Sequence, residues 1–223
     1  MNNLMRDFFD FLNSHCRYIV LRNWDILHDE NIHGKTHEDI DILCESLDLF
    51  VEITGAHRIH KEKNRDNYIV LFQDTEIRID VRWIGDGYYP ADMEKKMLLN
   101  RVLNEQSIYV PATEDYFYSL LYHALIQKPY LSEEYRIKLC SIHKTLSEVN
   151  RVQKDISFQD ALYGYIKTNG WSIEYPLDPG VYINKDIIKE FPINKNFSRQ
   201  CSRYCLIINQ RLSYYIKRFF HQK

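Results

Sequence analysis

The stretch "HEDIDILCES", residues 37–46, decides the fold of the first half of the chain. It sets two carboxylates, Asp39 and Asp41, one residue apart inside an otherwise apolar strand. Because side chains alternate across a strand, these two carboxylates point to one face while Ile40 and Ile42 point to the core. Carboxylates only about 7 Å apart repel each other, an arrangement that is tolerable chiefly where a cation lies between them.

A second run, "EIRIDVRWIG" at residues 76–85, alternates apolar and charged side chains like a strand with one buried face. Its apolar members are Ile77, Ile79, Val81 and Trp83, and its charged members are Arg78, Asp80 and Arg82. The preceding run "NYIVLFQD", residues 67–74, predicts a partner strand, and the turn-like pair Asp74-Thr75 predicts an antiparallel hairpin. Strand pairing can then place Asp80 beside the two earlier carboxylates.

Three converging carboxylates have a specific chemical meaning. Their oxygens suit Mg²⁺ or Mn²⁺, and such a cradle usually holds two metal ions for phosphoryl or nucleotidyl transfer. A lone D-x-D pair is weak evidence, because such pairs often cap strand ends, but an additional Asp inside a strand strengthens it. The sequence therefore predicts that Asp39, Asp41 and Asp80 are catalytic, metal-binding residues.

The order of these motifs resembles the nucleotidyltransferase superfamily, the fold shared by polymerase beta and the small bacterial nucleotidyltransferases. The resemblance rests on "YIVLRN", then "DIDIL", then "IRIDV", followed by helices, and it covers residues 1–110. In that family the D-x-D carboxylates and the later strand Asp bind the metals, which implies this role for Asp39, Asp41 and Asp80. The runs "LRNWD" and "YHALIQK" further resemble the branch associated with bacterial surface-polysaccharide genes.

The resemblance and the hydrophobic periodicity together imply an α+β chain. We expect a small mixed sheet of the nucleotidyltransferase fold in a catalytic domain at residues 1–110, and a helical domain at 111–223. Ser46 and Gly55 are expected to cap the two ends of a short helix, and Thr113 to cap a later one. Helices are predicted at residues 3–15 and 47–54, after a loop within 85–106, at 114–128, from 133 onward, at 157–168 and at 197–220.

The phosphate-binding motif of the family is absent from this sequence. The family normally places Gly-Ser directly after the first strand, so that backbone amides hold the nucleotide phosphates, whereas here residues 22–24 read "RNW". Three alternatives stay open. Arg22 and Asn23 supply substitute donors, or Lys35 within "GKT" at 34–36 takes the role, or nucleotide binding has been lost.

Five further side chains are candidates for substrate binding. Lys128 falls on the buried stripe of its helix, where it either reaches a phosphate at the domain junction or extends from the helix end to solvent. His123 and Tyr135 either line the same cleft or are core residues with satisfied hydrogen bonds. Arg78 and Arg82 flank the strand carboxylate, where they either neutralise substrate phosphates or pair with the carboxylates of the sheet.

Composition limits the class of protein. The 223 residues are 45% hydrophobic and 27% charged, as in ordinary globular chains, and the formal net charge of -2 argues against general nucleic-acid binding. Five cysteines, an odd number, suit a reducing compartment better than a disulfide scaffold. Asp7 and Asp10 interrupt the first apolar residues, so no secretory signal is expected and cytoplasmic localisation is predicted.

The tail from Lys195 to Lys223 is strongly basic. It carries seven Lys or Arg residues and no Asp or Glu, interleaved with Tyr and Phe. Two interpretations stay open: contact with an anionic membrane surface or a lipid-linked acceptor, or a packed terminal helix with a solvated basic face.

The leading hypothesis is an enzyme that transfers a nucleoside monophosphate from a nucleoside triphosphate to a small or sugar-bearing acceptor, in surface-polysaccharide biosynthesis. In it, Asp39 and Asp41 hold the metals, and Asp80 completes the site and orients or deprotonates the acceptor hydroxyl. The alternatives are an alditol-phosphate transferase with a CDP-linked donor and a non-catalytic binding module. A glycosyltransferase is disfavoured, because 38 residues before Asp39 are too few for its nucleotide-binding half.

Overall fold

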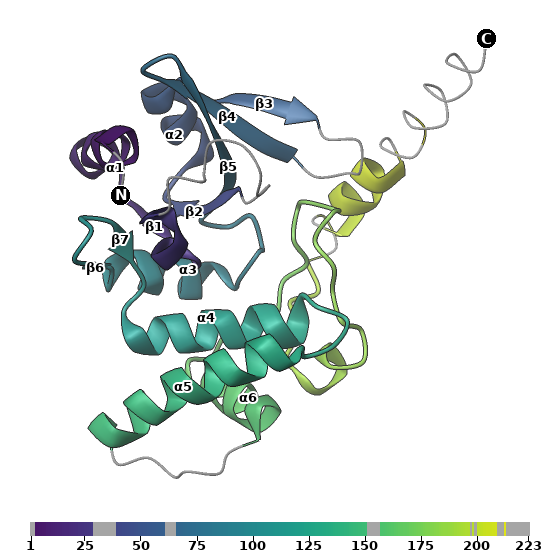
Figure 1. The fold of residues 1–223 in the computed structure, drawn as a ribbon. Coiled ribbons are helices and arrows are strands. Elements are labelled where there is room, and N and C mark those ends of the chain that lie inside the picture. The colour runs from purple at the N-terminus through teal and green to yellow at the C-terminus, as the bar shows by residue number, and fades with distance from the viewer. Residues whose placement is uncertain are drawn as a thin grey trace.

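The computed structural model describes residues 3–28, 39–60, 66–150, 157–196, 198, 200–208 and 212. In these residues the chain is a mixed α+β protein with a five-stranded mixed sheet, a small two-stranded sheet and several helices (Figure 1). The predicted fold class is therefore confirmed.

The larger sheet has the strand order β1-β2-β5-β4-β3. Its strands are β1 (Tyr18–Val20), β2 (Ile40–Cys44), β3 (His57–His60), β4 (Asp66–Phe72) and β5 (Thr75–Trp83). β2 and β5 run parallel, whereas the other neighbouring strands are antiparallel. The runs predicted as strands, "YIVLR" at 18–22, "DIDILC" at 39–44, "NYIVLFQD" at 67–74 and "EIRIDVRWIG" at 76–85, all join this sheet. β3 is a strand that the sequence did not predict.

The β4–β5 hairpin is confirmed, but its turn lies one residue earlier than predicted. Gln73 and Asp74 both have positive φ, 47° and 61°, and Phe72 pairs with Thr75. Two consecutive left-handed residues form the two-residue turn whose twist matches that of antiparallel strands. Thr75 therefore belongs to β5, and the predicted turn at Asp74-Thr75 is wrong.

The two faces of the sheet pack on different helices (Figure 1). These helices are α1 (Asn3–His15), α2 (Leu47–Thr54), α3 (Ala91–Leu99) and α4 (Thr113–Ile126). Ile42 and Ile79 share a core cluster with α1 and α2, whereas Ile19 and Leu43 share one with α3 and α4. Because side chains alternate along a strand, the charged side chains of β2 and β5 lie on the α3–α4 side.

Both predicted caps of α2 are present. The Ser46 side chain accepts a hydrogen bond from the Leu49 amide, and Gly55 ends the helix in the left-handed region with φ 65°. The Gly55 amide donates to the Val51 carbonyl and satisfies one of the last orphan acceptors. Short polar motifs therefore set the bounds of α2.

Replacing Gly55 with Ala is expected to lower the free energy of unfolding by about 1 kcal/mol. A Cβ at this position meets no atom within 4 Å, so the cost comes from the positive φ and not from a clash. Urea denaturation measures it. The control is Gly164→Ala in α6 (Phe158–Thr168), which also has open space and should stabilise the protein by about 0.5 kcal/mol or more. Equal effects of the two changes would contradict this account.

The helical half of the chain packs around α4. α5 (Glu133–Asn150) and α6 lie against it, and α4 is buried around most of its circumference. One core cluster contains residues from both sides of position 110, and the division into two domains there stays a prediction. Thr113 is the first helical residue of α4, and Ala112 is the N-cap without a side-chain hydrogen bond. The predicted Thr113 cap is therefore wrong, because the helix begins one residue too early for it.

The remaining elements are short. They are η1 (Trp24–His28), the paired strands β6 (Val102–Leu103) and β7 (Tyr109–Val110), and η3 (Ile188–Glu190). Of the helix predicted at 197–220, the described residues 198, 200–208 and 212 are helical, and the rest lies outside the described residues. None of the described helices has the length and hydropathy of a membrane span.

Candidate functional site

Two of the predicted carboxylates are direct neighbours in the sheet. Asp41 is the register partner of Asp80 in the parallel pairing of β2 with β5, so both side chains leave the same face. Asp80 is 1% exposed, and the Asp41 side chain is 15% exposed. The crossover between β2 and β5 thus brings together two acids that are distant in the sequence.

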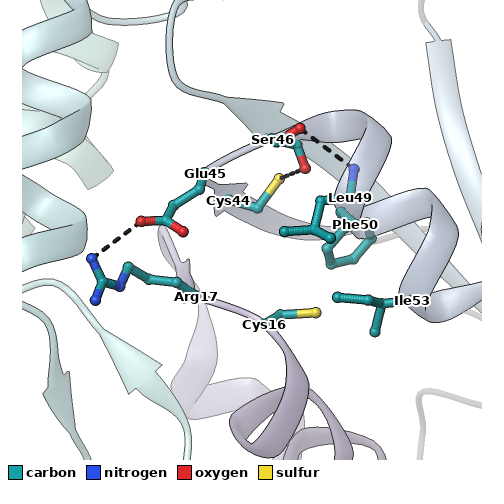
Figure 2. Close-up of a pocket in the computed structure, with 8 residues that line it drawn as sticks. All are labelled: Cys16, Arg17, Cys44, Glu45, Ser46, Leu49, Phe50 and Ile53. Carbon is teal, nitrogen blue, oxygen red and sulfur yellow. Dashed lines mark hydrogen bonds and ion pairs between the residues drawn. The ribbon is translucent and has the colours of Figure 1, made fainter.

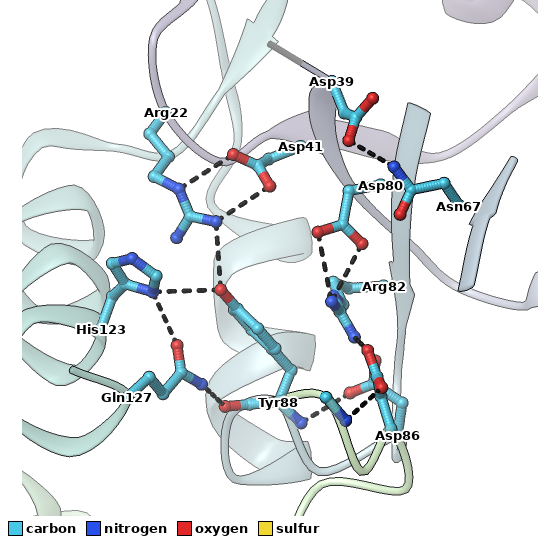
Figure 3. A network of polar contacts seen from close by, with 12 residues as sticks. Arg22, Asp39, Asp41, Asn67, Asp80, Arg82, Asp86, Tyr88, His123 and Gln127 are labelled. Carbon is cyan, nitrogen blue, oxygen red and sulfur yellow. Dashed lines mark hydrogen bonds and ion pairs between the residues drawn. The ribbon is translucent and has the colours of Figure 1, made fainter. Parts of the chain in front are cut away.

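Asp39 lies on the same face and contacts a residue that sequence reasoning missed. The side-chain amide of Asn67 in β4 donates to Asp39 Oδ2 (Figure 3). The β4–β5 register, continued by one residue, places Asn67 opposite Asp80. Asn67 is fully buried, and its Oδ1 has no hydrogen-bond partner in the described part of the chain. We call Asp39, Asp41, Asn67 and Asp80 the polar row.

Arg22, two residues after the end of β1, binds Asp41 through two nitrogens. Its Nε donates to Oδ2 over 2.9 Å, and its Nη2 lies 2.9 Å from Oδ1. The same Nη2 donates to the Tyr88 hydroxyl over 3.0 Å. Arg22 is buried at 9% exposure, so the predicted substrate-binding side chain is held against a carboxylate of the polar row.

Arg82 makes the matching contact with Asp80 (Figure 3). Its Nη2 lies 2.9 Å from Oδ1 and 3.2 Å from Oδ2, and its Nη1 donates to Asp178 Oδ2 over 3.1 Å. The guanidinium lies 4.5 Å from the centre of the Tyr88 ring. Arg82 is 3% exposed, and its Nε has no hydrogen-bond acceptor among the described residues. Of the two roles considered for Arg82, the structure shows the pairing with a sheet carboxylate.

Tyr88 connects these ion pairs to the helices. Its hydroxyl lies 3.0 Å from Nδ1 of His123, and that nitrogen lies 2.8 Å from Oε1 of Gln127. Because an amide oxygen only accepts, Nδ1 of His123 carries the proton. Burial raises the pKa of the Tyr88 phenol, which stays protonated. The Tyr135 ring packs edge-on against His123 at 5.6 Å, so these two predicted residues are brought together.

The other predicted residues lie less centrally. Asn23 is exposed with φ 59°, so Asn makes the left-handed turn that Gly favours. Arg78 is an exposed residue of β5, and Lys128 is half-buried just beyond α4, with its carbonyl accepting from Asn184. Lys35 lies outside the described residues.

A buried carboxyl pair supports the loop that carries Tyr88. Asp86 Oδ1 accepts from the Tyr88 amide over 2.6 Å, and Glu94 accepts from the amides of Gly85 and Tyr89. The Asp86 and Glu94 carboxyls also lie close enough for each to affect the pKa of the other. Burial raises the pKa of both groups, that of Asp86 to about 6, so the pair retains a proton in mildly acidic solution.

The change Asp86→Asn is expected to remove a pH dependence from the stability of the protein. Burial raises the Asp86 pKa from 3.8 to about 6. Between these two pH values the native state therefore binds more protons than the unfolded chain. The free energy of unfolding must then fall as the pH rises through this window. Wild type should lose roughly 3 kcal/mol more than Asp86→Asn across it, measured by urea denaturation at each pH. Parallel curves for the two proteins would contradict the assignment.

The polar row offers the donor chemistry of a magnesium or manganese site. Its ligands are carboxylate and amide oxygens, and the orphaned Asn67 Oδ1 is a further buried acceptor beside Asp80. In the described part of the chain, no group of three or more His, Cys, Asp or Glu side chains is arranged to hold a metal ion. Arg22 and Arg82 instead neutralise Asp41 and Asp80. The oxygen ligands of the polar row are of the kind that Mg²⁺ and Mn²⁺ prefer. A cation that binds Asp41 or Asp80 would have to displace the arginine now paired with that carboxylate.

A hollow elsewhere on the molecule lies between the end of α1, the end of β2 and α2 (Figure 2). It is lined by Cys16, Arg17, Cys44, Glu45, Ser46, Leu49, Phe50 and Ile53. Burial raises the pKa of both cysteine thiols, which are therefore protonated and unreactive near neutral pH. Arg17 pairs with Glu45 over 3.1 Å at the rim. This hollow has the chemistry of a packing gap and not of a reactive site.

Comparison with known proteins gives no family for this chain: no family model, no curated protein and no solved structure matches it. Any function assigned to it rests on its own residues and their geometry.

Proposed function

We propose that this chain is a metal-dependent transferase of the nucleotidyltransferase type. It moves a phosphorus-containing group, most simply a nucleoside monophosphate from a nucleoside triphosphate, to a small or sugar-bearing acceptor. The observation that carries the proposal is the register of β2 with β5, which sets Asp41 opposite Asp80 on the face that also presents Asp39. Three carboxylates on one sheet face, beside buried cationic side chains, suit a ligand made of divalent cations and phosphates.

The acids have distinct roles in the proposed reaction. Asp39, Asp41 and Asp80 would hold Mg²⁺ or Mn²⁺, which when bound neutralises phosphate charge and makes the attacking oxygen more acidic. Asp80 also orients the acceptor hydroxyl or takes its proton. Its deep burial, at 1% exposed, fixes its direction, and Asn67 holds Asp39 in place through its side-chain amide.

The basic and polar side chains receive the phosphates. Arg22 pairs with Asp41 and Arg82 pairs with Asp80, and Tyr88 lies between the two arginines (Figure 3). Arg22 lies two residues after β1, and the family that this sequence resembles has its Gly-Ser motif directly after the corresponding strand. We propose that Arg22 substitutes for that motif, because a guanidinium presents paired donors to phosphate oxygens.

The same fold could use either of two donors, a nucleoside triphosphate or a CDP-linked alditol. A CDP-linked alditol donor would release CMP, whereas a nucleoside triphosphate would release pyrophosphate. The arginine in place of the Gly-Ser motif keeps the CDP-linked donor as the alternative. Measuring pyrophosphate and CMP in the same reaction separates the two.

A non-catalytic binding module is the second candidate function. The specific observation in its favour is that both acids at the centre of the polar row are already paired with arginines. Such a module would bind nucleotides without consuming them, or would bind none. Calorimetric titration with magnesium and nucleotides, followed by product analysis, distinguishes it from the enzyme.

We also propose an anionic membrane surface as a partner of the C-terminal segment. Its described residues expose Tyr204, Leu206, Ile208 and Leu212, and the sequence around them is basic without an acid. Arg203 anchors this segment by donating to the carbonyls of residues 176, 178 and 181. Flotation with phosphatidylglycerol vesicles should show binding that high salt removes, and equal binding to phosphatidylcholine vesicles would contradict the charge argument.

A thermal-shift screen tests the enzyme proposal. Nucleotides and CDP-linked alditols are added with and without Mn²⁺ to wild type, Asp39→Asn and Asp80→Asn. Wild type should be stabilised by one donor class only when Mn²⁺ is present, and both variants should lose that response. Glu76→Gln, an exposed change on the same strand as Asp80, is the matched control and should respond like wild type. If wild type and both Asp variants respond alike, the catalytic assignment fails.

A further inference from the structure

Both central carboxylates of the polar row are paired with arginines in the structure. Arg22 reaches both oxygens of Asp41 at 2.9 Å, and Arg82 reaches both oxygens of Asp80 at 2.9 and 3.2 Å. A divalent cation would need the same oxygens, since carboxylates bind Mg²⁺ and Mn²⁺ through these atoms. A cation that arrives alone must therefore displace an arginine.

A displaced arginine cannot be left without an anion. Arg22 is 9% exposed and Arg82 is 3% exposed, so water gives little compensation for a lost carboxylate. Phosphate oxygens are the natural replacement, because they accept the paired guanidinium donors in the same way as a carboxylate. The Nε of Arg82, which has no acceptor among the described residues, is already available for one such contact.

The two arginines differ in the contacts that each would keep after a cation takes its carboxylate. Arg82 keeps Asp178 as a second acid at 3.1 Å and stays stacked on Tyr88. Among the described residues, the other side chain that hydrogen-bonds Arg22 is Tyr88, whose hydroxyl is neutral. The replacement of a carboxylate by a phosphate as the arginine's partner therefore matters most for Arg22.

From this arrangement we infer that divalent cation and phosphate bind interdependently, because Arg22 holds Asp41 until a phosphate takes the arginine and a cation takes the carboxylate. The inference rests on the proposed function and names its ligand class: a phosphate-bearing molecule that enters together with the cation. Because coupling between two ligands is reciprocal, phosphate must raise the affinity for the cation by the same factor as the cation raises the affinity for phosphate.

Mn²⁺ titration tests the inference, with free Mn²⁺ counted by electron paramagnetic resonance. The probe is inorganic phosphate, and a titration without protein corrects for Mn²⁺ that phosphate itself holds. Wild type should bind Mn²⁺ about tenfold more tightly when phosphate is present. Arg22→Gln should bind Mn²⁺ about tenfold more tightly than wild type without phosphate, and phosphate should add little to it. Arg17→Gln, which breaks an exposed Arg–Glu pair, is the control and should behave like wild type.

Each other outcome has a defined meaning. If wild type binds Mn²⁺ equally with and without phosphate, the coupling is absent and the inference falls, while the proposed function stands. If Arg22→Gln keeps the full coupling of wild type, the arginine is not its cause and the inference also falls. If no protein binds Mn²⁺ under any condition, the proposed function falls with it. Should Arg22→Gln not fold, Arg22→Lys takes its place and must show weaker coupling than wild type, because an ammonium cannot grip both carboxylate oxygens.

Discussion

Replacing Arg82 with Met is expected to lower the free energy of unfolding by about 3 to 5 kcal/mol, one of the largest stability losses for a single change in this chain. Arg82 is 3% exposed and lies between Asp80 and Asp178, with its guanidinium over the Tyr88 ring. Its removal takes the paired guanidinium away from the Asp80 carboxylate, which is buried at 1% exposure. Urea denaturation measures the loss, which should lower the melting temperature by roughly 10 °C.

Two further variants show whether the charge is the cause. Asp80→Asn combined with Arg82→Met removes both charges and should recover part of the lost stability, giving a coupling energy on the order of 1 to 3 kcal/mol. Arg17→Met breaks an exposed pair with Glu45 and should cost less than about 1 kcal/mol. Equal losses for Arg82→Met and Arg17→Met would show that burial of the Arg82 pair has no energetic consequence.

Asp39→Asn is expected to reduce turnover by roughly a hundredfold to a thousandfold while leaving the fold nearly unchanged. Asp39 is half-buried and accepts the Asn67 amide, a contact that the neutral Asn side chain can keep through its own oxygen. The lost quantity is the negative charge of Asp39, which the proposed chemistry needs. Turnover is measured as pyrophosphate or CMP release from the donor that the thermal-shift screen identifies.

The control for Asp39→Asn is Asp48→Asn, an exposed change in the first turn of α2. It should keep full turnover, and its loss of helix-dipole interaction should cost only about 0.5 kcal/mol. A variant Asp39→Asn that turns over at the wild-type rate would remove this residue from the catalytic group.

The parts of the fold that the sequence predicts are those set by local rules. Alternation along "EIRIDVRW" predicts the buried face of β5, and Ser46 with Gly55 predicts both ends of α2. β3 lacks such a pattern, because "HRIH" at 57–60 has only a weak alternation of apolar and polar side chains. It joins the sheet by pairing with β4. The sequence pattern therefore predicts elements that have a clear apolar face or capping residues of their own. It misses strands such as β3, which form by pairing with a neighbouring strand.

Within the site, the acids could be predicted, but most of their partners could not. Asn67 was missed because the predicted turn lay one residue late, which shifts the pairing across the hairpin; a turn at Gln73 and Asp74 places Asn67 opposite Asp80. Tyr88, Gln127 and Asp178 join the site from loops and a helix end, so no spacing in the sequence marks them.

The most direct test of the central claim is anomalous diffraction from a crystal grown with Mn²⁺ and inorganic phosphate. The account predicts a manganese peak at coordination distance from at least two of Asp39, Asp41 and Asp80, about 2.0 to 2.3 Å from their oxygens, with Arg22 turned toward the phosphate. Intact Arg22–Asp41 and Arg82–Asp80 pairs, with no manganese at the polar row under these conditions, would contradict it.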